Sequence, residues 1–234
     1  YEDIDLDKID VENLPELEKF MLSKLHSLNN KFKNYFKKYD FHNLYKELLN
    51  FCTTDLSAFY FDIRKDTLYC DPINSEKRKS CVTILNVLLK SLLRWFAPIL
   101  SFTTEEIHQL ISKNTKSIHL EKFLTFPDKF KNEQLTERWS QLIKIRDVCN
   151  ISIEEKRANK EIGSSLEAEL KIKLNEKYKD IISKIDLSEL CIVSKTQINF
   201  DGGPDILVET KKAPGDKCPV CWKISVEPCE RHSQ

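Results

Sequence analysis

Apolar side chains recur every three or four positions along most of the first 160 residues, which is the period of an α-helix. Residues 14–35 form the first such stretch and predict an amphipathic helix, with Asn13 as its cap and Pro15 in its first turn. Residues 40–52 resume the pattern and predict a second helix. Each of these helices is expected to bury one face.

The most apolar stretch of the chain, residues 81–100, carries Asn86, Lys90 and Arg94. We therefore expect a buried core helix there and no membrane span, and Pro98 is expected to end or kink it. The sequence TTEE at 103–106 resembles a capping box with Thr103 as the cap. It predicts a short helix that ends near Asn114.

A last long helix is predicted over residues 133–160, and Gly163 is its expected stop. The pattern then changes, because apolar and charged residues alternate strictly in 167–175, as they do in a half-buried strand. The remaining predicted elements are a helix over 177–185 and strands over 190–200 and 204–210 around the sequence DGGP.

Charge and cysteine usage narrow the class of protein. The formal net charge is zero, so a nucleic-acid partner would have to be met by a local basic face. Five cysteines are scattered in mostly apolar surroundings, as reduced thiols of a cytoplasmic protein are: Cys52, Cys70, Cys81, Cys149 and Cys191. The chain does not begin with Met, and we expect it to be a piece of a longer polypeptide.

The other three cysteines lie close together near the C-terminus, in the sequence CPVCWKISVEPCERH at 218–232. Cys218 pairs with Cys221 and Cys229 with His232 at a spacing that lets a tight turn aim both side chains at one point. A metal ion, a disulfide or a set of reduced thiols on a frayed tail would each fit. A cytoplasmic protein favours the metal, and three cysteines with one histidine suit a structural Zn²⁺ with no open position. Zinc would then supply the folding energy of a tail too short to bury a core.

These patterns predict a mainly α chain, in which a helical bundle is followed by a small α+β module and a C-terminal zinc knuckle. The expected parts are an acidic connector at 1–12, the bundle at 13–162, the α+β junction module at 163–212 and the knuckle at 213–234.

The sequence holds no glycine-rich phosphate loop, HExxH motif or nucleophile elbow, so no catalytic residue is predicted. Arg146, Arg157 and Lys160 are spaced to share one side of the last long helix. They are able to follow the phosphates of a nucleic acid, or they form an ordinary solvated face beside neighbouring glutamates. From the residues alone, an interaction role is the conclusion.

Four strings point to a known family. They are LSAFYFDIRKDTLYCD at 56–71, LLRWFAPILSFTTEEI at 92–107, RDVCNISIEEKRANKEIGSSLEAEL at 146–170 and KCPVCW at 217–222. In this order they resemble the C-terminal part of bacterial isoleucyl-tRNA synthetases, which are class I synthetases. The first two strings are shared with valyl and related synthetases, and the last two favour the isoleucine enzymes.

The resemblance implies an anticodon-binding domain over about 13–160. The remainder would be a junction and zinc module that helps to hold the anticodon arm. ATP, Mg²⁺ and editing chemistry would belong to domains upstream of this region. The implied partner is the tRNA for isoleucine, with no membrane or DNA partner, and the protein is expected to be a cytoplasmic monomer.

The resemblance also assigns residues. Cys218, Cys221 and Cys229 fall on zinc-cysteine positions of the family, whereas His232 stands where a fourth cysteine is usual, after a shortened loop. Trp222 is expected either to pack on the α+β module or to offer a stacking surface to a base. Arg146, Arg157 and Lys160 become candidate phosphate contacts.

Two other interpretations stay open at this point. The chain could be a zinc-stapled helical adaptor that binds proteins, or the same region of a valine- or leucine-specific synthetase.

Overall fold

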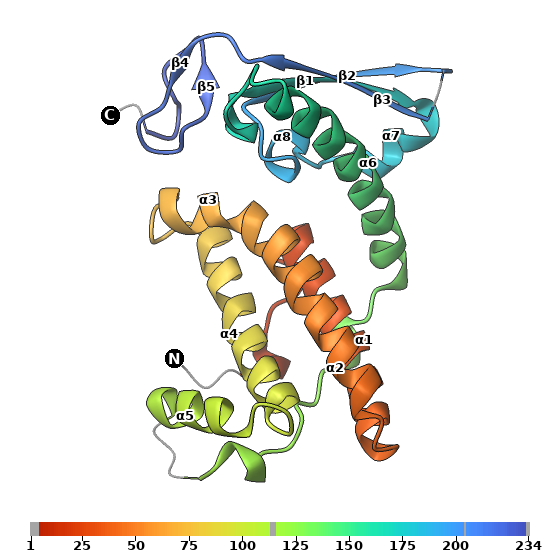
Figure 1. Cartoon of the computed structure of the whole chain (residues 1–234), viewed down its shortest axis with the longest axis vertical. Coiled ribbons are helices and arrows are strands. Elements are labelled where there is room, and N and C mark those ends of the chain that lie inside the picture. The colour runs from red at the N-terminus through yellow and green to blue at the C-terminus, as the bar shows by residue number, and fades with distance from the viewer. Residues whose placement is uncertain (1–4, 113–115, 204, 233–234) are drawn as a thin grey trace. The chain divides into compact units, whose positions relative to one another are not determined.

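The computed structural model describes residues 5–112, 116–203 and 205–232, which form two compact units. The first unit contains the residues up to Leu68 together with Pro72–Thr136, and the second contains Tyr69–Asp71 and the residues from Glu137 onward. The chain passes from one to the other within helix α6 (Glu133–Ala158) (Figure 1). The boundary expected after residue 162 therefore lies inside the second unit.

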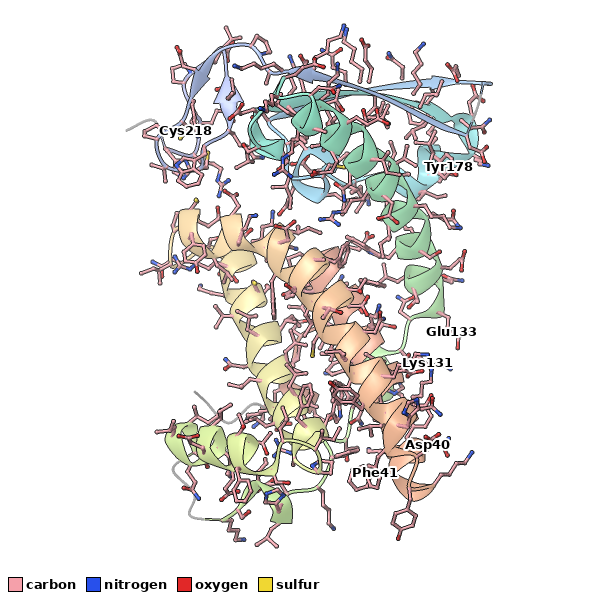
Figure 2. All side chains as sticks on the ribbon, viewed as in Figure 1. Asp40, Phe41, Lys131, Glu133, Tyr178 and Cys218 are labelled. Carbon is pink, nitrogen blue, oxygen red and sulfur yellow. The ribbon has the colours of Figure 1, made fainter. Side chains whose placement is uncertain are left out.

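The first unit is a helical bundle, as predicted. Its elements are η1 (Leu6–Lys8), α1 (Glu16–Lys37), α2 (Phe41–Asn50), the π-helix η2 (Phe51–Phe61), α3 (Asp62–Cys70) as far as Leu68, α4 (Glu76–Phe96), α5 (Ser101–Ile111), η3 (Ile118–Leu120) and η4 (Asp128–Phe130). The turn between α1 and α2 holds Asp40, whose carboxylate caps α2 by accepting from the Asn43 N–H (Figure 2). In the core, the rings of Phe32 and Trp95 meet edge to face at 4.9 Å. The apolar faces of α1 and α4 thus meet in the core of this unit.

Two predicted helix starts are wrong. Pro15 is itself the residue before α1 and makes no side-chain cap, while the Asn13 amide donates to Asp10. Helix α5 begins at Ser101, so Thr103 lies in the first turn and caps nothing. The predicted end of that helix, near Asn114, lies outside the described residues, and the structure ends α5 at Ile111.

The second predicted helix is much longer than expected, because α2 continues through η2 into α3 without a break. In a π-helix each N–H bonds to the carbonyl five residues earlier, so buried positions recur at a longer spacing. Phe51, Leu56 and Tyr60 are all buried and are five and four residues apart. The α-helical spacing of apolar residues in the sequence therefore ends near Cys52, at the start of the π-helix.

A buried ion pair fixes α1 against α3. The Arg64 guanidinium donates to both carboxylate oxygens of Glu18, at 2.7 Å and 2.6 Å, and both side chains are almost fully buried. The Tyr60 hydroxyl donates to the same carboxylate at 3.2 Å, and burial raises the pKa of this phenol far above its usual range. Such a pair constrains the bundle because neither charge is left without its partner.

The second unit combines α6 with a three-stranded sheet and a two-stranded ribbon. Its other elements are η5 (Ser165–Glu167), β1 (Ala168–Asn175), η6 (Glu176–Tyr178), α7 (Lys179–Ile182), α8 (Leu187–Leu190), β2 (Lys195–Asp201), β3 (Ile206–Lys212), β4 (Asp216–Lys217) and β5 (Ile224–Ser225). Strand β1 lies in the centre, parallel to β2 and antiparallel to β3. The α+β module is thereby confirmed.

The alternation predicted for β1 is also confirmed. Ala168, Leu170, Ile172 and Leu174 are fully buried. Helices α6 and α8 lie along one face of the sheet, and the Ser152 hydroxyl of α6 lies 2.7 Å from a hydroxyl of β3 (Figure 1). In the described part of the chain, no helix is both long and apolar enough to cross a membrane.

Glu18→Ala should destabilise the first unit by about 3–5 kcal/mol, because it leaves the Arg64 charge buried without its carboxylate. Lys79→Ala is the control, since it breaks an exposed pair with Glu76 and should cost about 0–1 kcal/mol. Urea unfolding followed by circular dichroism measures both. Equal effects of the two substitutions would contradict the role given to the buried pair.

Candidate metal centre and nucleic-acid interface

The C-terminal ribbon is a knuckle that holds the two halves of the cysteine and histidine motif together. Strands β4 and β5 pair antiparallel, and the Cys218 N–H donates to the Lys223 carbonyl at 2.9 Å. The Trp222 N–H turns back to the Cys218 carbonyl at 3.0 Å, which closes a tight turn around the first pair. The His232 N–H does the same to the Cys229 carbonyl at 3.0 Å. Cys218 lies at the end of this ribbon (Figure 2).

The four predicted ligands converge on one point. Their ligand atoms, three sulfurs and one imidazole nitrogen, all lie within 4.8 Å of one another. The Cys221 and Cys229 sulfurs are 3.8 Å apart, and Nδ1 of His232 lies 3.6 Å from the Cys218 sulfur and 3.3 Å from that of Cys229. Among the described residues, this is the one group of three or more such side chains placed to hold a metal ion.

The imidazole of His232 is oriented by its second nitrogen. Nε2 lies 3.3 Å from the carbonyl oxygen of Cys70, which belongs to the same compact unit. A proton on Nε2 satisfies that carbonyl and leaves a lone pair on Nδ1, directed toward the sulfurs. Metal-bound histidines are commonly held in this way by a backbone carbonyl. Cys70 is a part of the site that sequence reasoning missed, because nothing in the spacing of 218–232 points to a residue so distant in the chain.

The thiols of Cys218 and Cys221 differ in pKa. The N–H of Cys221 donates to the sulfur of Cys218 and, as the largest of several causes, lowers the pKa of Cys218 to about 6. Burial raises the pKa of Cys221 to about 11. Metals bind thiolates, so Cys218 offers a preformed ligand at neutral pH, whereas a cation must displace the proton of Cys221.

Trp222 follows the second cysteine in an unusual conformation. Its φ angle is +64°, in the left-handed region that favours glycine, and its side chain is 58% exposed. The Lys217 ammonium lies 5.1 Å from the centre of its ring. The ring is therefore not buried against the α+β module, and the part of it that Lys217 leaves uncovered is exposed to solvent.

The basic side chains predicted to share one exposed side of α6 do not do so. Arg146 is buried, and its Nε donates to the Leu190 carbonyl at 2.9 Å. It points into the second unit, toward the end of α8 (Leu187–Leu190), and this corrects the prediction that it is presented to phosphates. Arg157 is exposed and pairs with Glu154 at 2.6 Å.

Lys160 lies beyond the end of α6, which stops at Ala158 and not at Gly163. Lys160 has a φ of +60° and donates its N–H to the Arg157 carbonyl, while the next N–H donates to the Lys156 carbonyl. These two bonds form the C-terminal motif that usually places glycine at this position. A lysine here is exposed, and its position does not follow the helical spacing used to predict it.

Gly215→Ala should weaken metal binding by the knuckle about 5- to 150-fold, the equivalent of about 1–3 kcal/mol of strain. Gly215 has a φ of +111°, and a Cβ there would lie 2.1 Å from the Ser225 carbonyl oxygen across the ribbon. Chelator competition measures the affinity. Gly202→Ala is the matched control, since its Cβ would meet nothing within 4 Å. Equal metal affinity of the two variants would contradict the geometry given for the knuckle.

Comparison of the sequence with known proteins shows the family to which its relatives belong. Residues 18–173 match the family described as the anticodon-binding domain of tRNA ligase. The chain is 60% identical over 233 residues to an isoleucine–tRNA ligase of Pelagibacter ubique, covering 100% of this chain and 26% of that protein. It is 36% identical to the isoleucine–tRNA ligase of Agrobacterium fabrum, with 92% of this chain and 23% of that protein aligned. It is 35% identical to the isoleucine–tRNA ligase of Kosmotoga olearia, with 94% of this chain and 25% of that protein aligned. The chain thus spans about a quarter of the length of these relatives.

Proposed function

The chain belongs to the family of anticodon-binding domains of tRNA ligases, and from that premise we propose that it binds the anticodon arm of the tRNA for isoleucine. The observation that carries the proposal is the likeness to isoleucine–tRNA ligases along the whole chain, knuckle included. In this proposal the protein is cytoplasmic and monomeric, and it joins isoleucine to tRNA with ATP and Mg²⁺ bound outside this region.

We propose further that the knuckle binds one structural Zn²⁺ through Cys218, Cys221, Cys229 and His232. Zinc sites place sulfur at about 2.3 Å and nitrogen at about 2.0–2.1 Å, so a tetrahedron separates two sulfurs by about 3.8 Å and a sulfur from a nitrogen by about 3.6 Å. The separations of 3.8, 3.6 and 3.3 Å in the knuckle support this donor set. Four protein ligands leave no position for a reacting water, so zinc would hold the fold.

The surface that we propose for RNA combines the exposed Trp222 ring with the charges of Arg157 and Lys160. An exposed aromatic ring is able to stack on an unpaired base, and a lysine or arginine neutralises a phosphate. Trp222 and Lys160 both occupy left-handed backbone positions. Such a conformation costs a non-glycine residue about 1–2 kcal/mol, and a role in binding is a reason to keep these side chains there.

Binding of a tRNA transcript for isoleucine should weaken as salt rises, and Arg157→Ala and Lys160→Gly should each lower the salt slope by about one unit. Glycine is chosen because it removes the charge of Lys160 and relieves the backbone strain, so affinity should fall while stability rises by about 0.5–1 kcal/mol. Trp222→Ala should cost about 1–3 kcal/mol of binding with little change in slope. Filter binding at several salt concentrations measures these effects.

Lys144→Ala is the control, because Lys144 is an exposed cation of the same helix outside the string that resembles the synthetases. Arg146→Ala should act through stability, since its guanidinium binds a backbone carbonyl inside the unit. If the unaltered chain showed no salt-sensitive binding of tRNA, the proposed function would fail and a protein-binding adaptor would be favoured.

A further inference from the structure

A cavity of about 430 Å³ opens in the first unit, where the C-terminal ends of α1 and α4 meet residues 118–123. Its volume lies within the range of about 300–1,000 Å³ that is typical of small-molecule sites. No residue of the metal cluster or of the proposed RNA surface lines it. The cavity therefore calls for an explanation of its own.

Part of the cavity lining is apolar and aromatic. Phe36 of α1 and Phe123 are both half-buried, and their ring centres lie 5.2 Å apart at an angle of 73°. Ala97 and Ile118 are buried beside them. The two rings thus present part of their surface to whatever enters.

One wall is held rigidly by Arg94. Its guanidinium donates to the Lys122 carbonyl at 2.9 Å, to the Lys90 carbonyl at 3.0 Å and to the Glu121 carboxylate at 2.8 Å. These bonds tie the segment 121–123 to α4. They also pair Arg94 with Glu121, which is the one carboxylate among the lining residues. The wall is therefore formed before any ligand arrives.

The lining also contains three lysines, Lys33 and Lys37 of α1 and Lys122 of the segment 118–123. Within the described part of the chain, no carboxylate lies at ion-pair distance from any of the three. Lys33 and Lys37 are four residues apart on one helix face, an arrangement that costs a few tenths of a kcal/mol through repulsion, roughly 0.2–0.5. The helix dipole favours a positive charge at the C-terminal end of α1, which explains the presence of Lys37 there. It does not explain Lys122, which lies on a loop.

We propose that this cavity takes one unpaired nucleotide of the bound RNA, with the base against Phe36 and Phe123 and the flanking phosphates at Lys33, Lys37 and Lys122. The inference rests on the proposed tRNA binding and adds a second contact region to it. An aromatic ring in the lining is able to stack on any base, and three ammonium groups without a carboxylate partner suit a phosphodiester backbone. Because the chain has no net charge, such a local basic face is what an RNA contact requires.

Filter binding of the isoleucine tRNA transcript to the whole chain tests this assignment. Lys33→Ala, Lys37→Ala and Lys122→Ala should each lower the salt slope by about 0.7, the value per phosphate on a single strand. Phe123→Ala should weaken binding about 5- to 150-fold at an unchanged slope. If Phe123→Ala fails to fold, Phe123→Leu keeps an apolar side chain without the ring. Lys46→Ala is the control, an exposed lysine of α2 that does not line the cavity.

The outcomes separate this inference from the function on which it rests. If the unaltered chain binds tRNA and the three lysine variants match Lys46→Ala, the nucleotide site is wrong while the proposed function stands. If the variants keep their tRNA affinity and lose affinity for an acidic aromatic peptide, the cavity docks protein and the assignment is again wrong. Absence of any tRNA binding by the unaltered chain would overturn both.

Discussion

Four side chains converge on one point in the C-terminal knuckle, and the proposed metal there is the constraint on which the knuckle depends. Its strands are two residues long, and Val220, Trp222 and Val226 are exposed on it. The apolar atoms buried there are chiefly those of Cys218 and Cys221 themselves. A segment with so little buried surface gains little from the hydrophobic effect, and in the proposed zinc site its folding energy would come chiefly from ligand bonds to the metal. The placement of Trp222 depends on that constraint.

The proposed metal would link the stability of the knuckle to RNA binding by Trp222 in the second unit. A metal that fixes Cys218 and Cys221 also fixes the turn between them and Trp222, and with it the left-handed backbone that exposes the indole. An aromatic ring that is already oriented loses little freedom when it stacks on a base, so more of the stacking energy appears as affinity. The first unit prepares its cavity differently, because Arg94 fixes the wall through hydrogen bonds and needs no metal.

Much of this arrangement can be predicted from the sequence. The alternation in β1 and the convergence of the four candidate ligands both follow from short-range spacing, and the structure buries the apolar side of β1 and brings those four side chains together. Helical spacing, in contrast, placed Arg146 on an exposed side. The period of a helix tells which residues share a side but not which side is covered, and the side of Arg146 is covered by the end of α8, where its Nε donates to the Leu190 carbonyl.

Other features depend on contacts between distant segments. The cavity forms from three segments, and its lysines are unremarkable within each one. The carbonyl of Cys70 reaches His232 from 162 positions earlier in the chain. The π-helix was missed for a local reason, since its buried residues follow a spacing that an α-helical template does not contain.

X-ray absorption at the zinc edge, on the purified chain after exhaustive dialysis, tests the central claim most directly. The account predicts one zinc per chain, surrounded by three sulfurs at about 2.3 Å and one nitrogen at about 2.0–2.1 Å. Loss of the nitrogen shell in His232→Ala would identify the imidazole as its source. A shell of oxygen and nitrogen alone, or a fully reduced chain that retains no zinc, would contradict the account.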